Sequence, residues 1–259
     1  MSFNYKFTLS YNGSPFKGWQ RQSSEISAQR AFEDALYQVT GEKVKAVGAG
    51  RTDSGVHALG QVAHVIFKKK YVYDRLKRGT NFYLKGLPLT IHHVEEMSED
   101  FHARFSAIRR HYCYRLHINP TCCPLRVGHV WWIVRPLNIK AMKKAATFFK
   151  GHHDFSAFRD AECGGRSPLK TLDRCELIAP DNPFMKEEWH IHVSARSFLH
   201  RQVRIMVGSL VEVGLNRQPP EWIQRLLKGK KPRCYSGPTA PPEGLYFMKV
   251  TYLNERDNP

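Results

Sequence analysis

The spacing of hydrophobic residues along the chain predicts strands and helices. In segment 4–11 every second residue is apolar and the turn pair Asn12-Gly13 follows, which predicts a strand with one buried face. In segment 27–40 apolar residues instead recur every three or four positions. Ser27 is a suitable N-cap for a helix and Gly41 stands just beyond its end, so this segment is predicted to be helical.

The same two periods predict the remaining elements. Further strands are expected at 61–67, 91–97, 106–119, 131–134, 172–179, 189–195 and 245–252. Further helices are expected at 74–84, 138–149, 199–213 and 220–227. We therefore expect an α+β fold in which two similar α/β halves, 1–105 and 106–259, pool mostly antiparallel strands into one central sheet. Helices would flank this sheet, and a basic cleft would separate the halves.

One glycine-rich segment interrupts this pattern and carries polar side chains. Segment 49–60, AGRTDSGVHALG, lies between the apolar runs 44–47 and 61–67. Its glycines exclude a regular helix or strand, so we expect a loop that holds Arg51 and Asp53 in fixed positions. The alternative is an ordinary turn in which the Asp53 side chain bonds its own backbone.

The net charge of the chain indicates which class of partner it binds. The chain has 40 Lys and Arg against 23 Asp and Glu, a net charge of +17. Such an excess predicts a polyanionic partner, and nucleic acid is favoured over a membrane surface because no basic amphipathic anchor is evident. Segment 11–22, YNGSPFKGWQRQ, mixes aromatic and basic residues as a nucleic-acid surface does, although Trp19 taken alone is more often a core residue.

Cysteine usage and the N-terminus predict an intracellular chain that spans no membrane. The six cysteines include no C-x-x-C pair, so we expect reduced thiols and find little support for a zinc site. The first residues do not resemble a signal peptide, and no run of 18 apolar residues is present. We expect a cytoplasmic location, or a mitochondrial one in a eukaryote.

Several chemistries are disfavoured by the absence of their motifs. Metal-dependent phosphodiester cleavage needs clustered carboxylates, and the polar motifs here contain one conspicuous carboxylate, Asp53. The sequence has no G-x-S-x-G, P-loop or dinucleotide fingerprint. A lone aspartate with separated arginines and aromatics is typical of an enzyme that acts on a flipped-out base without a metal or cofactor.

Six segments together resemble the tRNA pseudouridine synthase A family. Around Asp53 the string GRTDSGVH is followed by GQV, with Ser54 where the family frequently has Ala. Phe16 stands where the family often has Tyr. The other matching segments, in the family's order, are 11–22, DFHARFSAIRRHYCY (100–114), HDFSAFR (153–159), SFLHRQVRIMVGSLVEVG (197–214) and EGLYF (243–247).

The resemblance implies a role for each of five residues. Asp53 matches the catalytic aspartate, and Arg204 matches the arginine that pairs with it. Arg51 matches the residue that fills the space left by an everted nucleotide. Tyr112 matches the ring that stacks on the target uracil, and Leu245 matches an apolar residue that lines the base pocket.

Without the resemblance, other interpretations of these residues remain open. Tyr114 would serve as well as Tyr112, and Arg204 could be a solvated helix arginine. Leu245 could be a core leucine of the last strand. His57 and His200 are assigned no catalytic role.

The resemblance also implies a substrate and an assembly. The family acts on uridines of the tRNA anticodon stem-loop, around tRNA positions 38 to 40, without a cofactor, and commonly works as a homodimer that binds tRNA across both subunits. Asp53 would act as a nucleophile or as a base. The alternative from another class is a non-enzymatic tRNA-binding protein, which turnover would distinguish.

Overall fold

The computed structural model describes residues 2–22, 25–164, 167–182, 185–229 and 231–253. In these residues five α-helices accompany one mostly antiparallel ten-stranded sheet, which confirms the predicted α+β class. The chain divides into two compact units. The N-terminal unit consists of residues 1–110 and 246–259, and the central unit of residues 111–245. Among the described residues, no helix has the length and apolar character needed to cross a bilayer.

The N-terminal unit is built around a sheet in which β1 lies between β3 and β4 and is antiparallel to both. Its Phe7 is opposite Ala63 of β3 and Val94 of β4. The last strand, β10, runs parallel to β3 with Tyr246 opposite His57, and the short β2 pairs with the other end of β3. The strands are β1 (Phe3–Tyr11), β2 (Val47–Gly48), β3 (His57–Phe67), β4 (Leu89–Met97) and β10 (Leu245–Tyr252).

This pairing departs from the sequence-based division of the chain. That division left residues 245–252 in the second half, whereas the backbone of β10 from Tyr246 onward pairs within the N-terminal unit. Gly60, which was expected to end a loop, lies inside β3. A Cβ at Gly60 would lie 2.3 Å from the Met248 carbonyl oxygen, so glycine here permits the close approach of β10 to β3.

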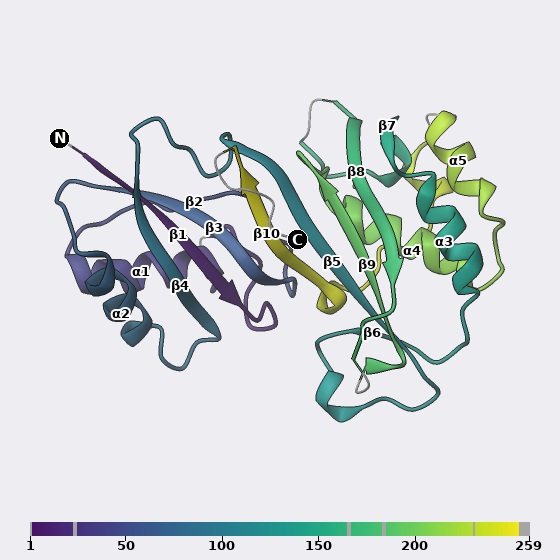
Figure 1. Ribbon diagram of the computed structural model, residues 1–259, viewed down its shortest axis with the longest axis horizontal. Helices are drawn as coiled ribbons and strands as arrows, with labels where there is room; N and C mark the ends of the chain where they lie inside the picture. Colours follow the sequence, from purple (N-terminus) through teal and green to yellow (C-terminus); the bar gives the residue numbers. More distant parts are fainter. Residues whose placement is uncertain (1, 23–24, 165–166, 183–184, 230, 254–259) are drawn as a thin grey trace. The chain divides into compact units, whose positions relative to one another are not determined.

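Helices α1 (Ala28–Thr40) and α2 (Tyr73–Tyr83) accompany the sheet of the N-terminal unit (Figure 1). The hydroxyl of Ser27 accepts a hydrogen bond from the Arg30 N–H, and Gly41 closes α1 at φ 71°. These caps confirm the helix predicted for 27–40. Phe32 of α1 packs edge-to-face on Phe7 of β1, with ring centroids 5.1 Å apart. The apolar stripe of α1 therefore covers the sheet.

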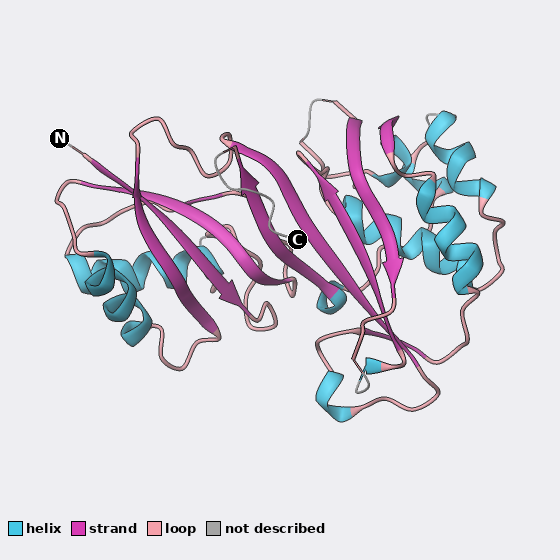
Figure 2. Ribbon diagram, in the orientation of Figure 1, coloured by secondary structure: helices cyan, strands magenta, loops and turns pink. Residues whose placement is uncertain are grey.

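The central unit contains a second set of strands, covered by helices (Figure 2). Strand β8 is antiparallel to β7 and β9, and β6 is parallel to β5. The strands are β5 (Ala107–Ile118), which begins in the N-terminal unit, β6 (Trp131–Ile133), β7 (Gly151–Asp154), β8 (Leu169–Ile178) and β9 (Glu188–Ala195). The pattern predicted β5, β6, β8 and β9 but missed β7, whose four residues are too few to show a period of two.

Helix α4 forms the core of the central unit, because nearly all of its residues are buried. It begins at Gln202 rather than at residue 199, since Arg201 has φ 56° and cannot continue a right-handed helix. Gly208 allows the chain at Pro238 to cross α4, because a Cβ there would lie 1.8 Å from the Pro238 carbonyl oxygen. The helices are α3 (Ile139–Thr147), α4 (Gln202–Gly214) and α5 (Glu221–Lys228). Short 3-10 turns are η1 (Pro124–Arg126), η2 (Ser156–Phe158), η4 (Arg233–Tyr235) and η5 (Pro242–Gly244).

Candidate functional site

The loop between β2 and β3 carries Arg51 and Asp53 and is fixed by main-chain hydrogen bonds. The Trp19 N–H donates to the Thr52 carbonyl at 3.1 Å, and the Gly55 N–H donates to the Phe16 carbonyl at 3.3 Å. These bonds lie on either side of Asp53, whose own carbonyl accepts from Val56 N–H at 3.2 Å. The backbone around the carboxylate is therefore held by segment 16–19.

Two glycines allow the neighbouring segment to approach the loop this closely. Gly18 has φ +82°, and a Cβ there would lie 2.4 Å from the Thr52 carbonyl oxygen. A Cβ at Gly13 would lie 2.1 Å from the Val56 carbonyl oxygen. Any side chain at either position would push the two segments apart. The sequence YNGSPFKGW thus has its glycines where the Asp53 loop is closest.

Thr52 anchors the loop in the core between two accessible side chains. Its hydroxyl shares a 2.8 Å hydrogen bond with the phenol of Tyr11, and both residues are buried. Burial raises the pKa of the Tyr11 phenol to about 12, so the hydroxyl stays protonated. Arg51 is exposed and Asp53 is half-buried. Arg51 and Asp53 therefore both keep exposed surface, whereas Thr52 between them points inward.

Trp19 belongs to this buried anchor. It is 2% exposed and stacks on Tyr11, with ring centroids 6.1 Å apart. Its indole also occupies the space beside Gly48, where a Cβ would lie 2.5 Å from Nε1. The core interpretation of Trp19 is therefore correct, and this ring is not available for stacking on a base.

His57 fixes the end of the loop. Its Nδ1 accepts a hydrogen bond from the Gly13 N–H at 3.1 Å, and its ring stacks on Tyr246 at 4.7 Å between centroids. The side chain is buried. His57 thus connects β3 to the turn after β1 and to β10.

Arg110 is a further supporting residue that was not predicted from the sequence. It is buried, and its Nε and Nη2 both donate to the Ala49 carbonyl, at 3.1 and 2.9 Å. Nη2 also donates to the Arg104 carbonyl and Nη1 to the Ala107 carbonyl. Arg110 therefore fixes the first residue of the Asp53 loop through a guanidinium surrounded by carbonyl oxygens. Its position within DFHARFSAIRRHYCY was the only indication in the sequence.

The central unit holds Tyr112, Arg204 and Leu245. Tyr112 is 9% exposed and its ring meets Phe198 edge-on at 5.1 Å. Arg204 lies in the first turn of α4, and its Nε donates to the Ala240 carbonyl at 2.8 Å. This bond fixes the side chain, so Arg204 is not a freely solvated helix arginine. Leu245 is buried at the start of β10.

Tyr114 can be excluded as the stacking ring. It is fully buried, and its hydroxyl donates to the Pro241 carbonyl at 2.7 Å. Its ring lies so close to Gly244 that a Cβ there would be 2.6 Å from two ring carbons. Tyr114 therefore supports the segment that leads into Leu245, and of the two tyrosines only Tyr112 retains exposed surface.

In the described part of the central unit, two groups of side chains have the composition of a metal site. The first group consists of Cys113, His190 and His192. Burial raises the pKa of the Cys113 thiol to about 12, so this thiol is no nucleophile by itself. The second group contains Asp160, Glu162 and His200. Asp160 there is engaged by Arg201 at 3.1 Å. Burial opposes the ionisation of Asp160, but the Glu162 N–H, Arg201 and His200 outweigh it and lower the pKa.

Comparison with known proteins identifies the family. The family model described as tRNA pseudouridine synthase matches residues 9–106 and 145–253. The tRNA pseudouridine synthase A of Methylocella silvestris is 47% identical over 249 residues, which cover 96% of this chain and 98% of that protein. The chain belongs to the tRNA pseudouridine synthase A family. The synthases A of Wolbachia pipientis wMel and Maricaulis maris are 43% and 45% identical, each over 96% of this chain and over 99% and 97% of their own lengths.

The family model matches most of the residues of the candidate site. Arg51, Asp53, Arg204 and Leu245 lie inside the matched ranges, whereas Tyr112 lies in the segment between them. Among solved structures, one match is to a chain in the crystal structure of a Cbf5-Nop10-Gar1 complex. The match covers 80% of this chain and 45% of that chain. Its TM-score is 0.33 at 14% identity, which adds nothing to the family assignment.

Proposed function

We propose that this chain isomerises uridine to pseudouridine in the anticodon stem-loop of tRNA, around tRNA positions 38 to 40. Membership of the tRNA pseudouridine synthase A family supports the reaction and its substrate class. The structural observation that carries the proposal is the Asp53 loop, whose backbone is anchored on both sides while Asp53 itself is only half-buried. A catalytic group needs this combination of fixed position and access to the substrate.

The isomerisation is balanced within one nucleoside. The bond between N1 of uracil and C1′ of ribose breaks, and a bond between C5 and C1′ forms. The proton on C5 is released, and N1 acquires one. Because no atom or electron is added from outside, the reaction needs no cofactor, and an ionised carboxylate suffices as the reactive protein group. Asp53 would supply it, either by attacking the nucleoside or by removing a proton from it.

The remaining site residues would bind and position the substrate. A cation beside a carboxylate favours its ionised form, and this is the proposed role of Arg204 toward Asp53. Arg51, exposed on the same loop, would fill the gap left by the everted uridine, whose unstacking costs a few kcal/mol. Tyr112 would stack on the uracil, and Leu245 would line its pocket.

The charge of the chain suits a polyanionic substrate. A net charge of +17 would support contacts to many phosphates, and each phosphate neutralised adds salt-dependent affinity. We propose that two copies of the chain bind one tRNA together, as a homodimer. Gel filtration of the protein with and without tRNA tests this assembly.

Pseudouridine mapping tests the function itself. An unmodified tRNA transcript is incubated with the purified protein in the presence of a metal chelator, and its pseudouridines are then located. We expect new pseudouridine in the anticodon stem-loop and none after incubation with Asp53→Asn. Pseudouridine confined to another arm of the tRNA would refute the proposed position. Tight tRNA binding without any pseudouridine would favour a non-enzymatic RNA-binding protein.

A further inference from the structure

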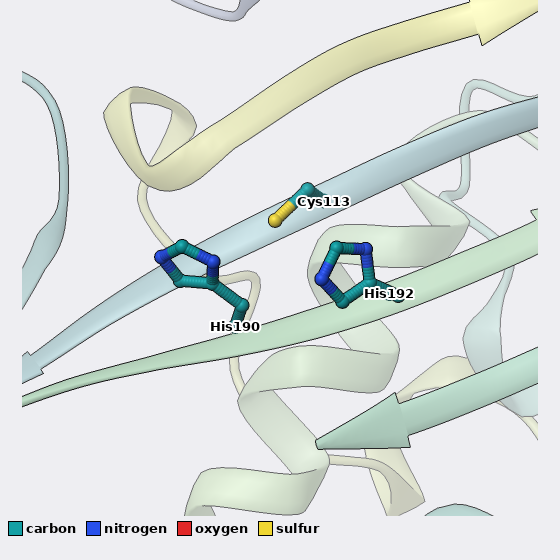
Figure 3. Close-up of side chains that lie close together, drawn as sticks. All are labelled: Cys113, His190 and His192. Carbon is teal, nitrogen blue, oxygen red and sulfur yellow. The ribbon is translucent and has the colours of Figure 1, made fainter. Parts of the chain in front are cut away.

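Three side chains with metal-binding donor atoms converge in the central unit. They are Cys113 on β5 and His190 and His192 on β9, and their donor atoms all lie within 4.8 Å of one another (Figure 3). In Figure 3 each imidazole has a ring nitrogen on the side that faces the Cys113 sulfur. One thiol and two imidazoles are ligands that Zn²⁺ prefers.

The strand geometry explains why these three residues meet. His190 and His192 are two positions apart on β9, so both side chains point to the same face of the sheet. Strand β5 is the neighbour of β9, and Cys113 lies on it. Tyr112 and Tyr114 flank Cys113 in the sequence and therefore point to the opposite face. The cluster is thus separated by the sheet from the proposed uracil-stacking ring.

A buried carboxylate provides a second, independent observation. Glu188 is fully buried, and its Oε2 lies 3.1 Å from Nε2 of His190. The carboxylate holds the imidazole through Nε2 and so fixes the orientation of the ring, which leaves Nδ1 as the nitrogen that can coordinate a metal ion. This carboxylate–histidine arrangement commonly supports metal ligands in proteins.

The charges around the cluster are compensated. Glu188 also forms ion pairs with Arg115 at 2.9 Å and with Arg126 at 2.9 Å. Arg174 of the neighbouring strand β8 pairs with Glu176 at 3.0 Å. The arginines near the three donors are therefore already neutralised in part by carboxylates. Coordination by a thiolate would remove one of the two charges of an incoming cation.

We propose that Cys113, His190 and His192 bind one Zn²⁺ ion, with water as the fourth ligand. On binding, the Cys113 S–H bond breaks, its proton leaves to solvent and a sulfur–zinc bond forms. Tetrahedral coordination places such donors roughly 3.3–3.8 Å apart, so small side-chain rotations would close the site. The ion would connect β5 to β9. A zinc site was not expected from the sequence, because these ligands come from two strands that lie far apart in the sequence and not from a C-x-x-C pair.

The test uses the full-length protein after removal of metal with a chelator. Calorimetric titration with Zn²⁺ is expected to show one tight site per chain. Titration with Co²⁺, which reports on its ligands by absorption, is expected to show a thiolate-to-cobalt charge-transfer band and the strong visible bands of tetrahedral cobalt. Cys113→Ser and His192→Gln should each weaken Zn²⁺ binding by at least about tenfold, and Cys113→Ser should abolish the charge-transfer band.

Cys175→Ser is the matched control, because Cys175 is another buried thiol, on the neighbouring strand β8. It should retain both the affinity and the cobalt spectrum. Unchanged Zn²⁺ binding by Cys113→Ser, or the absence of a tight site in the unsubstituted protein, would overturn the proposal. If circular dichroism shows that Cys113→Ser is not folded, His190→Gln replaces it, because the His190 side chain is 20% exposed and tolerates substitution better.

Discussion

The hydroxyls of Tyr11 and of Thr52, a residue of the candidate catalytic loop, lie 2.8 Å apart in the core of the N-terminal unit. Thr52 separates Arg51 from Asp53, so this one buried hydrogen bond holds the residue between the two accessible side chains. The position of the Asp53 carboxylate therefore depends on the first strand of the fold.

Removal of the Tyr11 hydroxyl should loosen the loop. Tyr11→Phe leaves the buried Thr52 hydroxyl without this partner, which costs about 1–2 kcal/mol of unfolding free energy. We expect a larger loss in the rate of pseudouridine formation than in tRNA affinity. Chemical denaturation and single-turnover kinetics measure the two effects. Tyr37→Phe, at an exposed position on α1, is the control and should change neither.

Gly18 should tolerate no side chain. Gly18→Ala places a Cβ 2.4 Å from the Thr52 carbonyl oxygen at φ +82°, so it combines backbone strain with a steric clash. Gly86 has φ +88° with nothing within 4 Å of the added Cβ, so Gly86→Ala carries the strain alone, about 1–2 kcal/mol. Denaturant melts should show the greater destabilisation for Gly18→Ala. Equal losses of unfolding free energy in the two variants would mean that the Asp53 loop moves aside for the added Cβ and that the steric clash does not destabilise the protein.

Arg110 should not be replaceable by lysine. Its guanidinium donates to three carbonyl groups at once, and an ammonium on a flexible stem cannot reproduce this geometry. Arg110→Lys should cost about 2–4 kcal/mol, because the buried carbonyls lose partners and a charge stays buried. Thermal unfolding measures this cost. Arg75→Lys, at an exposed position on α2, should be neutral, and a neutral Arg110→Lys would contradict the assigned role.

Acid should destabilise the protein through His64. Burial, with a smaller contribution from His102, lowers the pKa of His64 from 6.5 to about 4, and its Nδ1 accepts the Ala103 N–H at 3.1 Å. Between these two pKa values the unfolded state binds the proton and the folded state does not, so stability falls as the pH decreases. The loss between pH 7 and pH 5 should be about 2 kcal/mol.

Unfolding free energies at the two pH values measure this loss. The pH dependence should shrink by that amount in His64→Gln. The exposed His93 provides the control variant His93→Gln, which should keep the full dependence. An unchanged dependence in His64→Gln would show that His64 is not the group responsible.

The sequence predicted best what local patterns determine. The helix at 27–40 and the strand at 4–11 follow from their own periods and caps, and both are observed. The glycines around Asp53 predicted a loop between two strands, and residues 49–56 form one, although Gly48 and Gly60 belong to the flanking strands β2 and β3. The start of α4 was wrong, because the left-handed conformation of Arg201 arises from its surroundings and leaves no trace in the apolar pattern.

Long-range strand pairing and buried polar contacts could not be predicted from the sequence. The pairing of β10 with β3 joins residues far apart in the chain, and no local period reports it. Arg110 appeared to be one more basic residue of a strongly basic chain, because only the fold shows that carbonyl oxygens surround it. The expected roles of Tyr112, Arg204 and Leu245 came from the family resemblance, because the neighbouring residues in the sequence do not indicate them.

Whether Asp53 performs the chemistry is measured by the release of tritium from tRNA that contains 5-tritiated uridine. Under single-turnover conditions the unsubstituted protein and Asp34→Asn, a variant at an exposed aspartate of α1, should release tritium at similar rates. Asp53→Asn should release none while its tRNA affinity stays within several-fold. Tritium release by Asp53→Asn at the rate of the unsubstituted protein would contradict the account.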